Sequence, residues 1–277
     1  MPKHKVSHYY AQEYVDSTYS LLRMNLLLHG ISYTKFTAIN DDTLNHDKFY
    51  DDETGKPIKF TVQVANPPFS AEWTPELGLE NDPRYKQGGL PSTQYGEMGF
   101  VEHMVYHMDD DGRVAVVLPH GVTTRGEEYR IRKYLIDKNY VDAIIGLPPN
   151  MFHITTSAVL IMILKKNRNG NSDNVLFINA SKDFTKGRPK NYLTDEQINK
   201  IVQAYIERKS VEKYSAVVPI SEIIKNDYNL SINRYAHNYE SGDPIDIQEK
   251  ISELKVLNSK IANFDDKLSK WFEQLGM

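Results

Sequence analysis

Apolar runs of strand length alternate with segments of helical pattern over the first 180 residues of the chain. The clearest apolar runs are 60–65, 112–119, 140–147 and 157–164. Runs of this length and composition are typical of buried strands. The alternation predicts an α/β fold, with a mostly parallel sheet covered by helices on both faces.

An amphipathic helix is expected near the N-terminal end, from about residue 12 to 29. Its expected buried side carries Tyr19, Leu22 and Leu26, and Tyr33 is assigned to the same side. Apolar residues at steps of three and four share one face of a helix. We therefore expect these side chains to be buried against the sheet.

The pattern changes after residue 180, and this suggests three parts. Residues 1–180 are expected to form the α/β domain, and 181–244 a polar and helical extension in which Thr194 caps a helix. The tail, 245–277, carries apolar residues at alternating steps of three and four, at positions 254, 257, 261, 264, 268, 271 and 275. This heptad-like seam either packs on its own domain or pairs with a partner subunit.

Composition narrows the functional classes. The chain has 277 residues, 40% of them hydrophobic, which is enough to bury a core. The absence of cysteine excludes disulfides, thiolate zinc sites and thiol nucleophiles. The net charge of −4 indicates that any DNA affinity is local or supplied by a partner. No apolar stretch approaches the roughly 18 to 20 residues of a membrane span, so we expect no membrane contact and a cytoplasmic location.

The most informative motif is Asn66-Pro67-Pro68-Phe69, which directly follows the apolar run 60–65. It fits the methylation of an amino group on a flat, conjugated base. The lone pair of that nitrogen is delocalised into the ring, and two acceptors that bind its hydrogens would localise the pair toward an incoming methyl group. Asn66 offers its side-chain oxygen, and the carbonyl of Pro67 offers the second acceptor, held by the restricted geometry of the proline pair.

Phe69 completes this motif. Its ring offers a face on which a base can stack after rotation out of the duplex. The alternative is a proline-rich turn that simply leaves a strand. The surrounding sequence favours the chemical interpretation.

Further segments follow in an order that one family shares. They are Tyr10-Ala-Gln-Glu13, Arg23 to Gly30, Asn40-Asp41-Asp42-Thr43-Leu44, Val64 to Ser70, Gly112 to Pro119, Leu147-Pro148 with Phe152 and Thr155, and Asn226 to Leu230 with Arg234-Tyr235. With this series the chain resembles the modification (methylation) subunit of type I restriction-modification systems, an adenine-N6 DNA methyltransferase. The resemblance runs over nearly the whole chain.

The resemblance implies a Rossmann-like fold and S-adenosylmethionine as the cofactor. Glu13, at a strand end, would bind both ribose hydroxyls, because an ionised carboxylate offers two acceptors. Asp42 would accept from the exocyclic amine of the cofactor's adenine. Phe152 would line the pocket for the flipped base together with Phe69, or else belong to the core. A helix-start role for Glu13 and a turn-forming role for Asp42 are the alternatives.

No metal site is expected. His103 and His107 lie four residues apart on a predicted helix, which is a spacing that zinc sites use. Sequence shows neither an acidic neighbour nor a third ligand for them. They are interpreted as packing or surface residues.

The chain departs from the family pattern before Glu13. Methyltransferases of this class carry a glycine-rich turn after their first strand, where the backbone approaches the cofactor. No such element precedes Glu13, so 1–180 is interpreted as a truncated catalytic domain, from an excised fragment, a split gene or a decayed one. Positioning supplies about 7 kcal/mol or more of such a reaction, so we expect the isolated chain to be inactive.

The predicted function is that of an adenine-N6 DNA methyltransferase subunit in a type I complex. The expected partners are DNA, a specificity subunit and a restriction subunit, which makes a hetero-oligomer. The segment 245–277 is assigned to partner contact. The alternatives are a non-catalytic assembly module of the complex, or a related methyltransferase that acts on RNA or on a protein glutamine.

Overall fold

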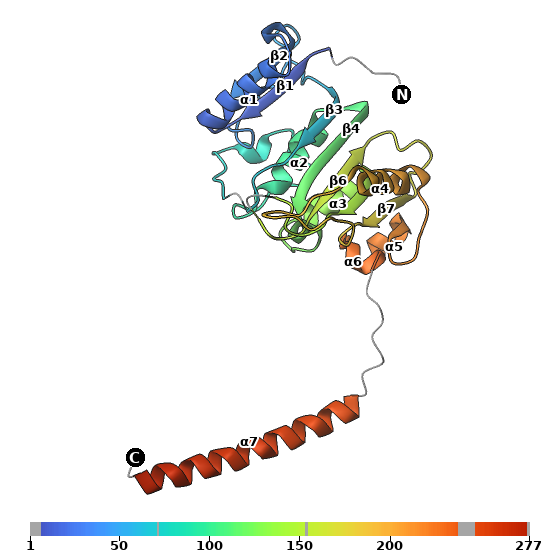
Figure 1. Cartoon of the computed structure of the whole chain (residues 1–277). Coiled ribbons are helices and arrows are strands. Elements are labelled where there is room, and N and C mark those ends of the chain that lie inside the picture. Colours follow the sequence, from blue (N-terminus) through green and yellow to red (C-terminus); the bar gives the residue numbers. More distant parts are fainter. Residues whose placement is uncertain (1–6, 71, 153–154, 238–246, 276–277) are drawn as a thin grey trace. The chain divides into compact units, whose positions relative to one another are not determined.

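The structure is a computed structural model, and its described residues form two compact units. The described residues are 7–70, 72–152, 155–237 and 247–275. The first unit lies within Met1–Asn238 and the second within Tyr239–Met277. Figure 1 traces the whole chain in sequence colours.

The first unit contains two sheets. A two-stranded sheet pairs β1 with β2, and a six-stranded sheet has the order β3-β4-β6-β5-β7-β8. The strands are β1 (Tyr9–Glu13), β2 (Phe36–Asn40), β3 (Phe60–Ala65), β4 (Met108–Pro119), β5 (Val141–Gly146), β6 (Val159–Lys165), β7 (Asn174–Asn179) and β8 (Ser215–Pro219). The predicted α/β class is confirmed.

The six-stranded sheet is mixed: β3, β4, β5 and β7 run in one direction, in line with the expected mostly parallel sheet, and β6 and β8 run against them. Among the described strands, β3–β4 and β5–β7 pair in parallel, whereas β4–β6, β5–β6 and β7–β8 pair antiparallel. Strand β6 runs antiparallel to its neighbours because of its connection to β5. The described residues of this connection form no helix that could make the crossover between parallel strands, so β6 turns back and lies between β4 and β5.

Helices cover both faces of this sheet, as predicted. On one face lie α2 (Glu97–Tyr106), α3 (Tyr129–Asp137), α5 (Ile220–Lys225) and α6 (Ile232–Tyr235), and on the other lies α4 (Asp195–Glu207). Helix α1 (Asp16–Leu28) contacts the two-stranded sheet, and α7 (Ile247–Leu275) belongs to the second unit. Short 3₁₀ turns lie at Tyr33–Lys35, Leu79–Asn81 and His120–Thr123.

Successive side chains of β5 point to opposite faces of the six-stranded sheet and belong to different hydrophobic clusters. Ile144 belongs to a large cluster with residues of α2, α3, α5 and α6. Ala143 and Ile145 belong to a second cluster, to which α4 contributes Ile201. Thr194 caps α4 as predicted, and it forms a reciprocal capping box with Gln197. Because β8 pairs with β7, residues after 180 extend the same sheet.

Strand β3 lies at an open edge of the sheet, and the prediction that 60–65 is buried was wrong. Val62 and Val64 are 70% and 78% exposed. Among the described strands, β3 pairs with β4 and with no other. Strand β3 is therefore apolar in sequence but has an exposed face and a row of backbone groups that are free to pair.

Helix α1 is also incompletely covered. Tyr19, Leu22 and Leu26 are half-buried, in line with their predicted side, but no residue of the helix is fully buried. Tyr33 is 75% exposed, so its assignment to the buried side was wrong. The chain leaves α1 at Gly30, which adopts a left-handed conformation, and Tyr33 therefore no longer follows the helical period.

The second unit consists of α7, described here by itself. The predicted seam is present on a continuous 29-residue helix. Its members Leu254, Leu257, Ile261, Phe264, Leu268 and Trp271 are 46% to 64% exposed. Among the described residues, no helix is long and apolar enough to cross a membrane.

A buried charge network ties α4 to the sheet. Asp142 in β5 accepts hydrogen bonds from Arg168 at 3.0 Å, Arg208 at 3.1 Å and the hydroxyl of Tyr205. Lys165 lies 3.1 Å from the same carboxylate. Burial raises the pKa of Asp142, but these partners outweigh burial and lower it. One carboxylate thus balances several cations that have little contact with water.

We predict that Asp142→Asn lowers the free energy of unfolding by about 3–5 kcal/mol, because it leaves buried guanidinium groups without a counter-charge. Urea unfolding at pH 7 measures the change. The matched control is Asp137→Asn, which breaks the exposed Lys133–Asp137 pair within α3. That control should cost less than about 0.5 kcal/mol. Equal losses in both variants would contradict the assignment.

Candidate functional site

A cleft of about 1090 Å³ opens where β1, β2 and β3 end. Glu13 closes β1, Asp42 follows β2, and Pro68 follows β3, and all three line this cleft. The other lining residues are Gln12, Tyr14, Val15, Asp41, Thr43, Leu44, Asn45, His46, Glu72, Trp73, Thr74, Glu76, Thr93, Gln94 and Phe100. Carboxyl ends of the strands meet here, which is where α/β sheets bind ligands. The cleft thus brings together the two sequence-predicted carboxylates and Pro68 of the Asn-Pro-Pro-Phe turn, whereas Asn66, Pro67, Phe69 and Phe152 are not among its lining residues.

The turn after β3 presents its residues unequally. Asn66 and Pro68 are exposed, Pro67 is buried, and Phe69 is half-buried. Asn66 can therefore meet a ligand from solvent. The buried ring of Pro67 restricts the backbone of the turn, since a buried ring has little freedom to move.

Phe69 and Phe152 pack against the same hydrophobic cluster, which lies on the α4 face of the sheet. Both rings are half-buried. They come from the turn after β3 and from the loop between β5 and β6. Both rings are therefore part of the packing at the margin of the core, and Phe69 follows the candidate acceptors directly in the chain.

Local hydrogen bonds hold both predicted cofactor carboxylates. Glu13 Oε1 accepts from the backbone N–H of Val15 at 2.9 Å. Asp42 accepts from the backbone N–H of Leu44 and from the side chain of Asn45, each at 2.9 Å. Each carboxylate oxygen has a second lone pair. Both groups are therefore oriented by the protein and retain the capacity to accept from a ligand.

His46 is a cleft residue that the sequence reasoning missed. Its ring lies 2.6 Å from Asp41 and 3.0 Å from Glu76. The hydrogen bond from His46 lowers the pKa of Asp41 to about 2, and the reciprocal bond raises the pKa of His46. Lys48 adds a further contact to Asp41 at 3.0 Å. In the sequence, Asp41 was the feature that could have pointed to His46, because a second acid beside Asp42 favours a nearby cation.

The structure supplies the acidic neighbour that sequence did not show for the two helical histidines. Ligand atoms of Asp47, His103 and His107 lie within 4.8 Å of one another. Each histidine is nevertheless already engaged. His107 Nε2 lies 3.0 Å from both oxygens of Asp47, and its Nδ1 donates to the carbonyl of Ile58 at 2.7 Å. His103 Nδ1 lies 3.2 Å from Arg84, whose guanidinium can only donate.

These contacts describe a hydrogen-bonded pair rather than a set of free metal ligands. The fixed positive charge of Arg84 also disfavours a second cation beside His103. Burial raises the pKa of Asp47, but the hydrogen bond and the charge of His107 outweigh it and lower the pKa to about 2. The side chain of Asp47 is 4% exposed. The pair therefore links the loop before β3 to the end of α2.

We predict that Asp47→Asn destabilises the protein at pH 7 by about 2 kcal/mol, the equivalent of the lowered pKa. A depressed carboxyl pKa stabilises the fold above its unfolded value near 4. The difference between wild type and variant should therefore shrink as pH falls from about 4 to about 2. Urea titrations across this range measure it. A difference that stays constant with pH would rule out the Asp47–His107 pair as its source.

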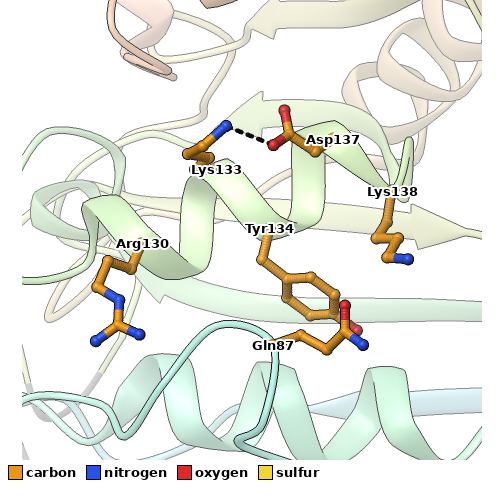
Figure 2. A pocket seen from close by; sticks show the side chains of 6 residues that line it. All are labelled: Gln87, Arg130, Lys133, Tyr134, Asp137 and Lys138. Atoms are coloured by element: carbon orange, nitrogen blue, oxygen red, sulfur yellow. Dashed lines mark hydrogen bonds and ion pairs between the residues drawn. The ribbon is translucent and has the colours of Figure 1, made fainter.

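A second pocket, of about 430 Å³, lies along α3 and carries none of the predicted site residues. Figure 2 shows its lining, with Tyr134 and Gln87 facing each other and Arg130 and Lys138 at opposite ends of the helix. Lys133 in this pocket donates to Asp137 at 2.6 Å. The cleft at the strand ends is therefore the candidate functional site.

Comparison with known proteins agrees with this choice. A family model described as N-6 DNA Methylase matches residues 2–243. The chain belongs to the N-6 DNA methylase family. The residues that the family model matches include every sequence-predicted site residue of the chain, from Glu13 to Phe152.

Similar proteins include methylase subunits of type I restriction enzymes. The MpnII methylase subunit of Mycoplasma pneumoniae is 36% identical over 94% of this chain and 47% of its own length. The MjaVII methylase subunit of Methanocaldococcus jannaschii is 33% identical over 91% and 44%. The crystal structure of the type I methyltransferase subunit from Streptococcus thermophilus has a TM-score of 0.77 and 42% identity over 83% and 48%. The chain spans about half the length of these relatives.

Proposed function

We propose that this chain forms part of a methyltransferase subunit that transfers a methyl group from S-adenosylmethionine to the N6 amine of adenine in DNA. The observation that carries the proposal is the cleft that Glu13, Asp42 and Pro68 line together, with Asn66 in the same turn as Pro68. Family membership supports the same reaction. The proposed substrate is a base rotated out of the duplex, because an adenine amine inside a duplex cannot reach a cleft.

The residues of the cleft fit the cofactor. Glu13 would hold the ribose hydroxyls and Asp42 the adenine amine, since each carboxylate keeps free lone pairs. When bound, S-adenosylmethionine would supply the methyl group from its positively charged sulfonium. The acidic lining of the cleft complements that charge.

Asn66 and Pro67 act on the target amine. The side-chain oxygen of Asn66 and the carbonyl of Pro67 each accept one N–H, which localises the nitrogen lone pair. S-adenosylmethionine held by Glu13 and Asp42 would supply the methyl carbon and would keep on sulfur the electron pair of the broken carbon–sulfur bond, while Asn66 and Pro67 would keep the nitrogen lone pair aimed at that carbon. The surplus proton then leaves the nitrogen to water. Phe69 stacks on the base and fixes its plane.

Additional polypeptide is proposed to complete the active enzyme. The free edge of β3, with Val62 and Val64 exposed, can accept a further strand. Leu21, Leu27 and Leu28 on α1 are exposed by 52% to 82% and form a second uncovered surface. The relatives, about twice as long, contain sequence that could cover both.

We predict that this chain alone binds S-adenosylmethionine at least about 100-fold more weakly than it does together with a polypeptide that covers the free edge of β3, because the cleft is only partly walled. Titration calorimetry of both samples measures the two affinities. Equal affinity would show that the described cleft is sufficient by itself.

The proposed partners are DNA, a specificity subunit and a restriction subunit. The seam on α7 supplies a surface of the kind that pairs helices. The overall acidity of the chain supports the idea that a partner provides most of the DNA affinity. The same exposed seam favours a second candidate, a non-catalytic assembly module that keeps the fold and the partner contacts.

We predict that Asn66→Ala in the reconstituted assembly lowers methyl transfer to DNA by about 100-fold or more, because it removes one of two acceptors that act on the reacting nitrogen. Transfer of a labelled methyl group measures the rate. Asn81→Ala, at an exposed 3₁₀ turn, is the matched control and should keep full activity. Full activity of Asn66→Ala would leave the assembly module as the better description.

A further inference from the structure

The end of the Asn66–Phe69 turn is held by a residue outside the motif. Ser70 follows Phe69 and adopts a left-handed backbone conformation, with φ of 52°. A residue with a side chain pays energy for this conformation and keeps it where its surroundings enforce it. The backbone N–H of Ser70 donates to Glu97 Oε1 at 2.6 Å. Glu97 begins α2 and is 0% exposed.

The same carboxylate is tied to the segment that follows β4. Glu97 Oε2 lies 3.8 Å from Arg125, and Arg125 lies 3.0 Å from Glu128. The guanidinium of Arg125 stacks 3.8 Å above the ring of Tyr95. Two buried carboxylates thus share one arginine, and burial raises the pKa of Glu128.

This cluster is costly for the fold. Among the described residues, Glu97 Oε2 and both carboxylate oxygens of Glu128 make no hydrogen bond, although Arg125 forms ion pairs with both groups. Buried polar groups without hydrogen bonds are rare in native proteins and call for an explanation. A purely structural element could use an apolar residue at position 97 at lower cost. The hydrogen bond to Ser70 is what an apolar residue could not supply.

We infer that Glu97 is a positioning residue for methyl transfer, which holds the Asn66–Phe69 turn through the backbone N–H of Ser70. The inference rests on the proposed function of this turn. Glu97 does not touch the base or the cofactor in this assignment. It acts on the placement of the two acceptors.

The geometry of the turn explains why one anchor matters. Its first end is fixed by the sheet, because Ala65 is in register with Val116 of β4. Pro67 and Pro68 fix the dihedral angles between the ends. The remaining freedom lies at Ser70, so a hydrogen bond there determines where the acceptors of Asn66 and Pro67 point. A displacement of about 1 Å at a reacting group can cost about 100-fold in rate.

The test compares Glu97→Ala with Glu97→Gln in the full chain and in the reconstituted assembly. Glutamine keeps an oxygen that can accept from Ser70, and alanine does not. Glu102→Ala is the matched control, because Glu102 is buried on the same helix and no hydrogen bond connects it to the turn among the described contacts. Hydrogen exchange of the peptide that contains residues 66–70 reports on the anchor without any need for activity.

Glu97→Ala is expected to speed hydrogen exchange at this peptide and to lower kcat by about 100-fold, with KM for cofactor and DNA changed by less than about 3-fold. Glu97→Gln should restore slow exchange and most of kcat. Glu102→Ala should resemble wild type in both measurements.

Three results would overturn the inference. They are unchanged exchange in Glu97→Ala, unchanged kcat in Glu97→Ala, and an equal loss of kcat in Glu97→Ala and Glu102→Ala. The last result would assign Glu97 to general stability of α2. A wild-type assembly that transfers no methyl group would contradict the proposed function instead, and the exchange measurement would still decide whether Glu97 anchors the turn.

Discussion

The parallel pairing of β3 with β4 is the constraint on which the candidate site depends. The register of Ala65 with Val116 brings the turn after β3 to the same edge as the segment after β4. Only this alignment allows Glu97 and Arg125, from separate elements, to close around the end of the turn. The acceptor geometry proposed for Asn66 is thus a consequence of sheet register, supplemented by one buried carboxylate.

The sequence predicted those parts of the fold that depend on local pattern. Apolar runs marked the strands, Thr194 marked the start of α4, and strand ends marked Glu13 and Asp42 as neighbours in space. The direction of β6 could not be predicted in this way, because the apolar pattern of a buried strand is the same in parallel and antiparallel pairs. Exposure of β3 was missed for a related reason, since edge position depends on partners rather than on the strand's own residues.

Contacts between distant residues formed the other limit of sequence reasoning. Asp47 and His107 are 60 positions apart, and nothing in their local sequence joins them. Glu97 resembles any first-turn acid that favours a helix N-terminus. Its bond to Ser70 follows from how α2 packs beside β4, which is a property of the folded chain. Functional partners of this kind become visible only when the backbone positions are known.

The lining of the cleft is acidic, and the elements around it are buried to different extents. Its lining carries the carboxylates of Glu13, Asp41, Asp42, Glu72 and Glu76, offset by His46. Such a surface attracts a cationic cofactor and repels the phosphates of DNA, so a base must enter while its backbone is held by another surface. The lining residues at the ends of β1 and β2 form a first wall, which belongs to strands that contain no fully buried residue, whereas Phe100 lies on α2, which packs on the core. Ligand and partner binding will therefore stabilise the first wall most, because the least stable region gains most from new contacts.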